Sequence, residues 1–170
     1  MSGVAASAKG VDLVLRDRIG PDDRERVSSL VTATGFFSPE EVAVALELVD
    51  ERLTRATPSG YQFLFADHGG TTVGYTCFGP VPATIGSFDL YWIVVDPAQQ
   101  RQSVGRFLIQ GSEERMRADG GRRVYAETSS RPQYLPTRVF YERVGYREVA
   151  FLPDFYAPGD GKVIYCKSLR

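Results

Sequence analysis

The strongest constraint on the fold is an apolar run that ends at an Asp-Pro pair and leads directly into a helical pattern. The run is DLYWIVV, residues 89–95, and apolar residues recur at helical spacing over residues 103–118. Because nearly every residue from Leu90 onward is apolar, this strand is expected to be central in a sheet and covered on both faces. A central strand that passes into a helix is typical of a mixed α/β protein.

The turn between this strand and helix is polar and has the features of an anion site. The first backbone N–H groups of a helix lack intrahelical partners, and the helix dipole places partial positive charge there. Gly105 would allow a ligand to approach the backbone closely, and Gln100, Arg101 and Gln102 could add side-chain donors. An ordinary strand–helix connection fits the same residues. The glycine patterns of dinucleotide and ATP sites are absent, so neither ligand is predicted.

Size and charge narrow the class of protein and its partners. A chain of 170 residues with 43% hydrophobic residues suits a single domain, and its formal net charge of −1 attracts neither nucleic acid nor an anionic membrane. Residues 1–10 lack the apolar core of a signal peptide, and we expect a disordered tail there before one domain over residues 11–170. Cys77 and Cys166 predict neither a disulfide scaffold nor a metal site, and favour a cytoplasmic protein.

The remaining segments alternate between strand and helix patterns. Two helices are expected early in the chain, and Ser38 and Glu41 form a capping box at the start of the second. The strands expected before residue 89 are 12–19, 61–67 and 71–79. The predicted order is β-αα-β-β-β-α-β-α-β-β, which describes an α/β fold with a mixed sheet.

Two segments resemble the GNAT superfamily of acetyl-CoA-dependent N-acetyltransferases. VDPAQQRQSVGRFLI is similar to the acyl-CoA-binding motif, with Val95, Pro97, Gln100 and Gly105 at matching positions and Ser103 where a glycine is usual. RVFYERVGY, residues 138–146, resembles the family's downstream element. The resemblance implies a GNAT-like fold, with a splayed central strand pair that binds acyl-CoA, and acetyl-CoA as the co-substrate. No metal is implied.

The resemblance also implies which residues hold acetyl-CoA. Backbone groups of the central strand would pair with the pantetheine arm, and the Val95 N–H would face the thioester oxygen. The pyrophosphate would lie on the turn and the first turn of the helix. The cofactor-binding residues predicted in this way are Ile93, Val94, Val95, Gln100, Arg101, Gln102, Ser103, Val104, Gly105 and Arg106.

The attacking amine must lose a proton, and the CoA thiolate is best protonated as it leaves. The reaction therefore needs a general base for the amine and a general acid for the thiolate. The resemblance implies Tyr141 as the acid, while the adjacent Phe140 is the expected core residue. Asp89 is the candidate base, because a carboxylate at the start of an apolar strand is unfavourable unless it is paired or functional. Glu127 is the reserve candidate, and transfer of the proton to water is the remaining alternative. Strict alternation would put Asp89, Tyr91, Ile93 and Val95 on one face of the strand.

The acceptor is expected to be a primary amine of a small or amino-acid-like molecule that attacks the thioester directly. The residues predicted to bind it are Phe36, Phe37, Tyr75, Tyr91, Glu127 and Tyr156. A protein lysine or a peptide α-amine is the alternative acceptor, and a non-catalytic acyl-CoA-binding module is a third possibility. Tyr134 stands where the family often has Asn, so no CoA-binding role is carried over to it. The protein is expected to be a monomer or a homodimer.

Overall fold

The computed structural model describes residues 5–8, 11–100 and 103–170. Its helices are α1 (Asp23–Ala33), α2 (Pro39–Arg55), α3 (Val104–Ala118) and α4 (Leu135–Arg143), with short 3-10 turns η1 (Thr57–Ser59), η2 (Pro97–Gln99) and η3 (Pro132–Tyr134). Its strands are β1 (Ala5–Ala8), β2 (Val11–Arg16), β3 (Gln62–His68), β4 (Thr71–Pro80), β5 (Ser87–Val95), β6 (Arg123–Ser129), β7 (Arg147–Ala157) and β8 (Asp160–Ser168). The predicted order of elements is confirmed from β2 to β8.

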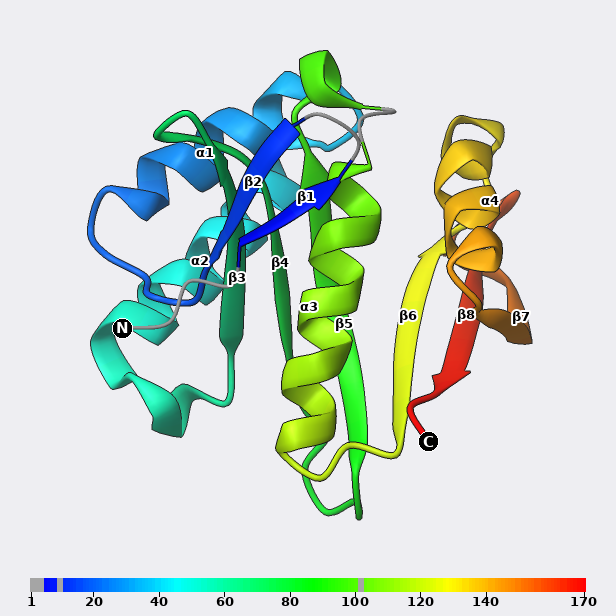
Figure 1. The fold of residues 1–170 in the computed structure, drawn as a ribbon. Coiled ribbons are helices and arrows are strands. Elements are labelled where there is room, and N and C mark those ends of the chain that lie inside the picture. Colours follow the sequence, from blue (N-terminus) through cyan, green and yellow to red (C-terminus); the bar gives the residue numbers. More distant parts are fainter. Residues whose placement is uncertain (1–4, 9–10, 101–102) are drawn as a thin grey trace.

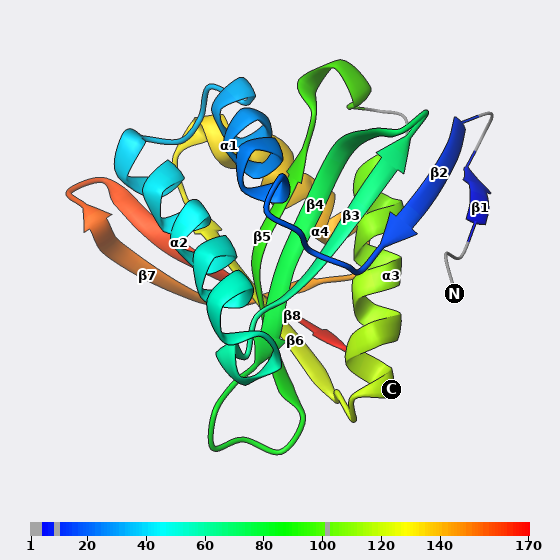
Figure 2. The same ribbon diagram turned by 90° about the vertical axis from the view of Figure 1, so that its left-hand side faces the viewer.

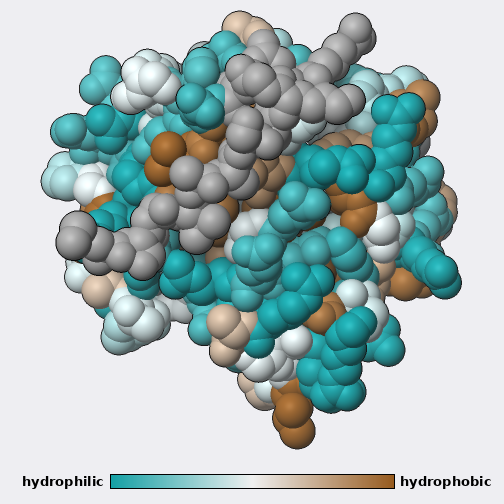
Figure 3. Space-filling model, in the orientation of Figure 1, coloured by the Kyte–Doolittle hydropathy of each residue, from teal (hydrophilic) through white to brown (hydrophobic). Residues whose placement is uncertain are grey.

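The strands of the described residues form one mixed sheet with the order β1-β2-β3-β4-β5-β6-β8-β7. Helices α1 and α2 cover one face of this sheet and α3 covers the other (Figure 2). Helix α4 follows β6 and lies over the C-terminal strands (Figure 1). The solvent-facing surface over α3 is largely hydrophilic (Figure 3). This is expected of an amphipathic helix whose apolar residues are buried against the sheet.

The N-terminal segment departs from the prediction at Ala5–Ala8. These residues form β1, which pairs antiparallel with β2, whereas a disordered tail was expected there. The expectation relied on the missing apolar pattern, but an edge strand can form through backbone hydrogen bonds, which need no particular side chain.

Helix α2 begins where the sequence predicts. The Ser38 side chain accepts the N–H of Glu41 at 3.2 Å, and the Glu41 carboxylate accepts the N–H of Ser38 at 2.7 Å. This capping box fixes the N-terminus of α2. From there α2 buries Ala45 and Val49 against β3 and β4.

Strands β5 and β6 separate part-way along their length. Their parallel pairing runs from Ser87 opposite Arg123 to Leu90 opposite Ala126. Beyond Leu90, β5 pairs with β4 alone among the described residues. The sheet is therefore split at its centre, as predicted, and one edge of β5 is open between Tyr91 and Val95.

No helix in the described part of the chain is both long and apolar enough to cross a membrane. The described residues also contain no group of three or more His, Cys, Asp or Glu side chains arranged to hold a metal ion.

Candidate active site

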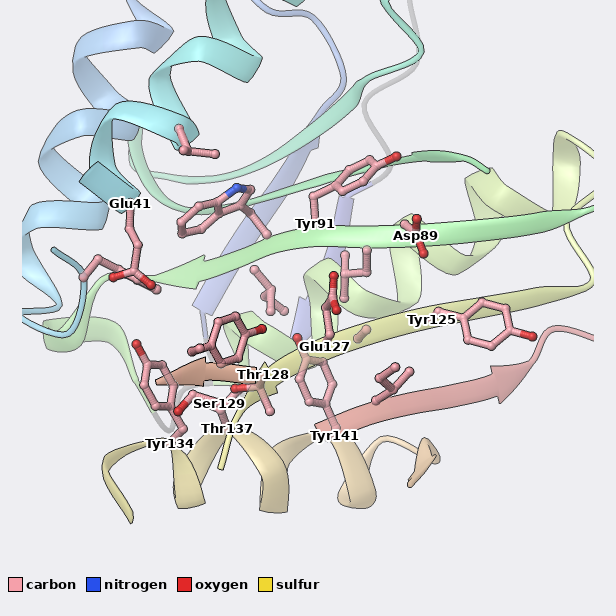
Figure 4. A pocket seen from close by; sticks show the side chains of 18 of the residues that line it. Glu41, Asp89, Tyr91, Tyr125, Glu127, Thr128, Ser129, Tyr134, Thr137 and Tyr141 are labelled. Carbon is pink, nitrogen blue, oxygen red and sulfur yellow. The ribbon is translucent and has the colours of Figure 1, made fainter. Parts of the chain in front are cut away.

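A pocket of about 910 Å³ lies where the central strands separate. Its walls come from the N-terminal half of α2, from β5 and β6, from η3 and α4, and from the β7–β8 hairpin (Figure 4). The pocket thus combines segments from most of the chain. The predicted site residues that line it are Phe37, Asp89, Tyr91, Ile93, Glu127, Tyr141 and Tyr156.

Tyr75 and Phe36, which were predicted to bind the acceptor, are not among the residues that line this pocket. Tyr75 is fully buried beneath α1 and α2, where its ring stacks on Phe63 and Phe65. Burial raises the pKa of Tyr75 well above its usual value. Phe36 lies at the rim, 46% exposed, with its ring 6.3 Å from that of Tyr134. The prediction for Tyr75 is therefore wrong, because its position on β4 turns the side chain into the core.

A β-bulge in β5 decides which side chains face the pocket. Cys77 of β4 pairs with Trp92, but its neighbour Phe78 pairs with Leu90, so Tyr91 is an extra residue with no partner opposite it. The extra residue reverses the alternation along the strand.

The expected common face of Asp89, Tyr91, Ile93 and Val95 is therefore wrong. Ile93 and Val95 pack on the α3 side of the sheet, together with the core on that side. Phe88 and Leu90 belong to the core cluster that contains Ile109 and Met116 of α3. Asp89 points away from that core and lines the pocket on the α2 side. The bulge places Asp89 on the opposite side of β5 from Ile93.

Asp89 and Glu127 line the same pocket from neighbouring strands: Asp89 lies in the last paired stretch of β5, and Glu127 lies on β6 just beyond the end of the pairing (Figure 4). Glu127 forms an ion pair with Lys162 of β8, whose ammonium also lies 3.9 Å from the centre of the Phe155 ring. Burial, and then the charge of Glu127, raise the pKa of Asp89, while Lys162 opposes this rise. The half-buried Asp89 is the carboxylate without an ion-pair partner among the described residues. It is thus the more available proton acceptor of the two.

Tyr141 rises from α4 into the pocket (Figure 4). It is 4% exposed, and its ring lies 5.4 Å from that of Tyr146 and 5.5 Å from that of Tyr165. Burial, and then Tyr165, raise the pKa of Tyr141, so its hydroxyl stays protonated at neutral pH. Phe140 is only partly buried, contrary to its predicted place in the core. Tyr141 is therefore the more buried of the two, and it faces the pocket.

The open edge of β5 presents backbone groups of Ile93 and Val95. The N–H of Asp96 donates to the carbonyl of Val73 on β4 at 2.9 Å. Residues of an antiparallel strand alternate between facing the paired strand and facing away from it. Counted back from Asp96 through the observed register, Val94 faces β4, whereas Ile93 and Val95 face the gap. Val94, which was predicted to bind the cofactor, has its backbone turned to β4 and its side chain 3% exposed.

The N-terminus of α3 lies just beyond the end of β5. Ser103 precedes the helix with φ +65°, a left-handed conformation, and its side chain makes no capping hydrogen bond. The N–H groups of Val104, Gly105 and Arg106 begin the helix, and the Ser103 carbonyl accepts the N–H of Phe107. Gln100 ends η2. The predicted donors Arg101 and Gln102 lie outside the described residues.

Gly105 has a packing role that the sequence did not indicate. A Cβ at this position would lie 3.2 Å from the ring of Phe140 and 3.7 Å from Val95. The missing side chain therefore lets α3 and α4 approach each other across the split in the sheet. In this structure Gly105 serves helix packing as well as leaving the helix N-terminus accessible.

The comparison with protein families matches residues 30–146 to the acetyltransferase (GNAT) family. This match covers more than half of the chain. The chain belongs to the GNAT acetyltransferase family. A solved structure from Desulfovibrio desulfuricans, assigned to the same family, is 45% identical, with a TM-score of 0.91 over 93% of this chain and 99% of that one. The protein is accordingly an acetyl-CoA-dependent acyltransferase.

More distant GNAT structures share the fold. An aminoglycoside 6'-N-acetyltransferase complexed with coenzyme A is 18% identical, with a TM-score of 0.73 over 92% of this chain and 97% of that one. The ribosomal-protein-S18-alanine N-acetyltransferase from Escherichia coli is 17% identical, with a TM-score of 0.71 over 92% and 94%. Their names give a small molecule and a protein as acceptors, so the fold does not identify the acceptor. A comparison with curated protein sequences found no significant match.

Several GNAT pocket residues were missed by the sequence analysis. They come from the start of α2, from β6 and from the connection to α4: Ser38, Glu41, Thr128, Ser129, Arg131, Tyr134 and Thr137. Tyr134 was noted only because it replaces the usual Asn, yet it is 8% exposed and forms part of the wall. The run of Thr, Ser and Arg side chains from the end of β6 to Arg131 was the available signal, because a turn alone does not require so many polar side chains.

Proposed function

We propose that this protein transfers the acetyl group of acetyl-CoA to the primary amine of a small or amino-acid-like molecule by direct attack. The observation that carries the proposal is that Asp89 and Tyr141 line one pocket at the split between β5 and β6. One residue can accept a proton and the other can donate one, which are the two proton transfers that the reaction requires.

Asp89 is proposed as the general base. Its raised pKa brings the carboxylate closer to the value at which a base is most effective near neutral pH. Glu127 forms an ion pair with Lys162, and this ion pair would have to be disrupted before Glu127 could act as the general base. Glu127 is instead proposed to attract and orient the acceptor ammonium, together with the aromatic rings of Tyr91 and Tyr156.

Tyr141 is proposed as the general acid. Its pKa is raised, so the phenol remains protonated and can donate to a leaving thiolate throughout the neutral pH range. Its ring is held between Tyr146 and Tyr165, which fixes the direction of the hydroxyl. A positioned acid of this kind contributes about 10²-fold or more to the rate.

The residues present fit an acyl-CoA thioester. Acetyl-CoA, when bound, supplies the activated acetyl group. Ile93 and Val95 expose backbone N–H and C=O groups at the open edge of β5, where the Val95 N–H is the proposed donor to the thioester oxygen. The N-terminus of α3 offers N–H groups and partial positive charge for the pyrophosphate, and Gln100, Arg101, Gln102 and Ser103 are proposed as further donors.

A thiol-release assay with acetyl-CoA and a panel of primary amines, amino acids and short peptides tests this function. We expect release that depends on a primary amine, with the N-acetylated product identified by mass spectrometry. Asp89→Asn should reduce turnover, whereas Asp50→Asn, an exposed change on α2 in the Arg24 ion pair, should not. Binding of CoA without turnover of any acceptor would contradict the proposal and favour a non-catalytic acyl-CoA-binding module.

A further inference from the structure

Two segments that are distant in the sequence meet at one end of the pocket. The Tyr134 hydroxyl in η3 donates to the carbonyl of Phe36, 98 residues earlier, at 3.5 Å. The rings of the same two residues lie 6.3 Å apart. We call this pair the Tyr134–Phe36 bridge. It joins the connection between α1 and α2 to the connection between β6 and α4.

The Tyr134 side of the bridge is firmly held. Arg131 places its guanidinium over the Tyr134 ring at 5.6 Å, and its Nε lies 3.1 Å from the carboxylate of Asp160. Arg138 of α4 donates to the carbonyls of Ser129 and Arg131 at 2.8 and 3.1 Å. These contacts tie η3 to α4 and to the start of β8. These contacts therefore hold the Tyr134 side of the pocket in a fixed position.

The Phe36 side is anchored through its neighbours. Phe37 packs its ring edge-on against Trp92 of β5, with 5.0 Å between the ring centres. Gly35 ends the preceding helix with φ +69°, a conformation that favours glycine. Phe36 itself remains 46% exposed, so the core does not account for its position. Its ring and its carbonyl both contact Tyr134.

The bridge lies at the end of the pocket where β5 and β6 are no longer paired. Strands β5 and β6 diverge beyond Leu90 and Ala126, and Tyr134 follows the end of β6. Figure 4 shows Tyr134 at the end of the pocket toward which β5 runs, pointing toward Glu41 of α2. Tyr134 lines the pocket at this end, and the Phe36 carbonyl accepts the hydrogen bond that ties Tyr134 to the α1–α2 connection. A ligand that extended in this direction would meet the Tyr134 side chain.

We infer that Tyr134 is a specificity-determining residue that restricts the acceptor to small amines by closing this end of the pocket against longer ones. This inference rests on the proposed function, and it names the size class of the acceptor. It predicts that polypeptide amines are poor acceptors because of the bridge, and that loss of the bridge admits them. If Tyr134 served only core packing, its loss would reduce the stability of the protein without changing the preference for short over long amines.

Three variants separate these roles. Tyr134→Ala removes the bridge, Tyr134→Phe removes only the hydroxyl, and Tyr61→Ala enlarges the pocket at another wall, where Tyr61 contacts Tyr91 at 5.4 Å. Each is assayed with the best small amine of the panel and with the same amine lengthened at its far end by triglycine. Amide hydrogen exchange of residues 34–38 provides a readout that needs no acceptor.

We expect Tyr134→Ala to raise kcat/KM for the lengthened amine relative to the short one by about tenfold. Exchange of residues 34–38 should accelerate about fivefold or more, since the bridge opposes local opening. For Tyr134→Phe, both the kcat/KM ratio and the exchange rate should lie between those of Tyr134→Ala and the wild type. An unchanged ratio, an unchanged exchange rate, or an equal gain in Tyr61→Ala would overturn the inference. Absence of turnover with every amine would instead contradict the proposed function, and the exchange rates would then decide whether the bridge exists.

Discussion

Replacing Ser103 by glycine should stabilise the protein, although the change removes a hydroxyl from the turn before α3. Ser103 adopts φ +65° and ψ 8°, a left-handed conformation in which an L side chain is strained by roughly 1–2 kcal/mol. Glycine adopts this conformation without that penalty, but it loses about 0.5–1 kcal/mol more backbone entropy on folding. The difference leaves a stabilisation of about 1 kcal/mol.

The matched control is Ser103→Ala, which keeps the strained φ and removes only the hydroxyl. Because the Ser103 side chain makes no capping hydrogen bond in the structure, this change should alter the free energy of unfolding by less than about 0.5 kcal/mol. Calorimetry of the wild type, Ser103→Gly and Ser103→Ala measures the Tm and the unfolding free energy of each protein. For a domain of this size, Ser103→Gly should raise Tm by about 2–4 °C.

Two results would refute this reasoning. A Tm for Ser103→Gly at or below that of the wild type would show that the left-handed conformation is not strained. A loss of about 1 kcal/mol in Ser103→Ala would show that the hydroxyl caps the helix, as an N-cap serine ordinarily does. The same variants report on the cofactor site, since weaker CoA binding in both would indicate that the hydroxyl donates to phosphate.

Three further predictions concern charge and chemistry. Asp89→Asn should lower kcat by about 10²–10⁴-fold and remove the acidic limb of the pH–rate profile, because the raised pKa of Asp89 makes the base protonated as pH falls through it. Tyr141→Phe should lower kcat by about 10²-fold, and the wild-type rate should show no loss from Tyr141 ionisation up to about pH 10, both measured by thiol release. Asp23→Ala should destabilise the fold by about 3–5 kcal/mol in urea unfolding, because Asp23 is 1% exposed and accepts two hydrogen bonds from Arg16 at 2.9 Å. An unchanged profile, rate or unfolding midpoint, respectively, would contradict each assignment.

The order of the elements could be predicted from local signals. The capping box of Ser38 and Glu41 is confirmed, and the apolar run that ends before Pro97 is a central strand beside a parallel neighbour, as expected. These features depend on residues close together in the chain, where propensity, caps and periodicity agree. The splayed strand pair came from the family resemblance, and the structure confirms it.

The details of the pocket depended on contacts that local patterns do not contain. The bulge at Tyr91 lies in a strand that is apolar on both sides, so no alternation was present to reveal the reversed faces of Asp89 and Ile93. Tyr75 was assigned to the pocket by residue type, but its strand position directs it into the core. The role of Tyr134 depends on Phe36, which is too distant in the sequence for periodicity to connect them.

The bulge at Tyr91 also sets how this strand tolerates changes in length. Since Tyr91 is the residue without a partner on β4, its deletion would restore regular pairing and leave Asp89, Leu90, Trp92 and Ile93 on their present faces. Deletion of Trp92 would have the same effect on the pairing, because Tyr91 already lies on the α2 side and would take the place opposite Cys77. Deletion of any other residue between Asp89 and Val95 would turn part of the strand over, moving a pocket side chain into the core or a core side chain into the pocket. The central strand can therefore lose either residue of the bulge without reversing the faces of its other side chains.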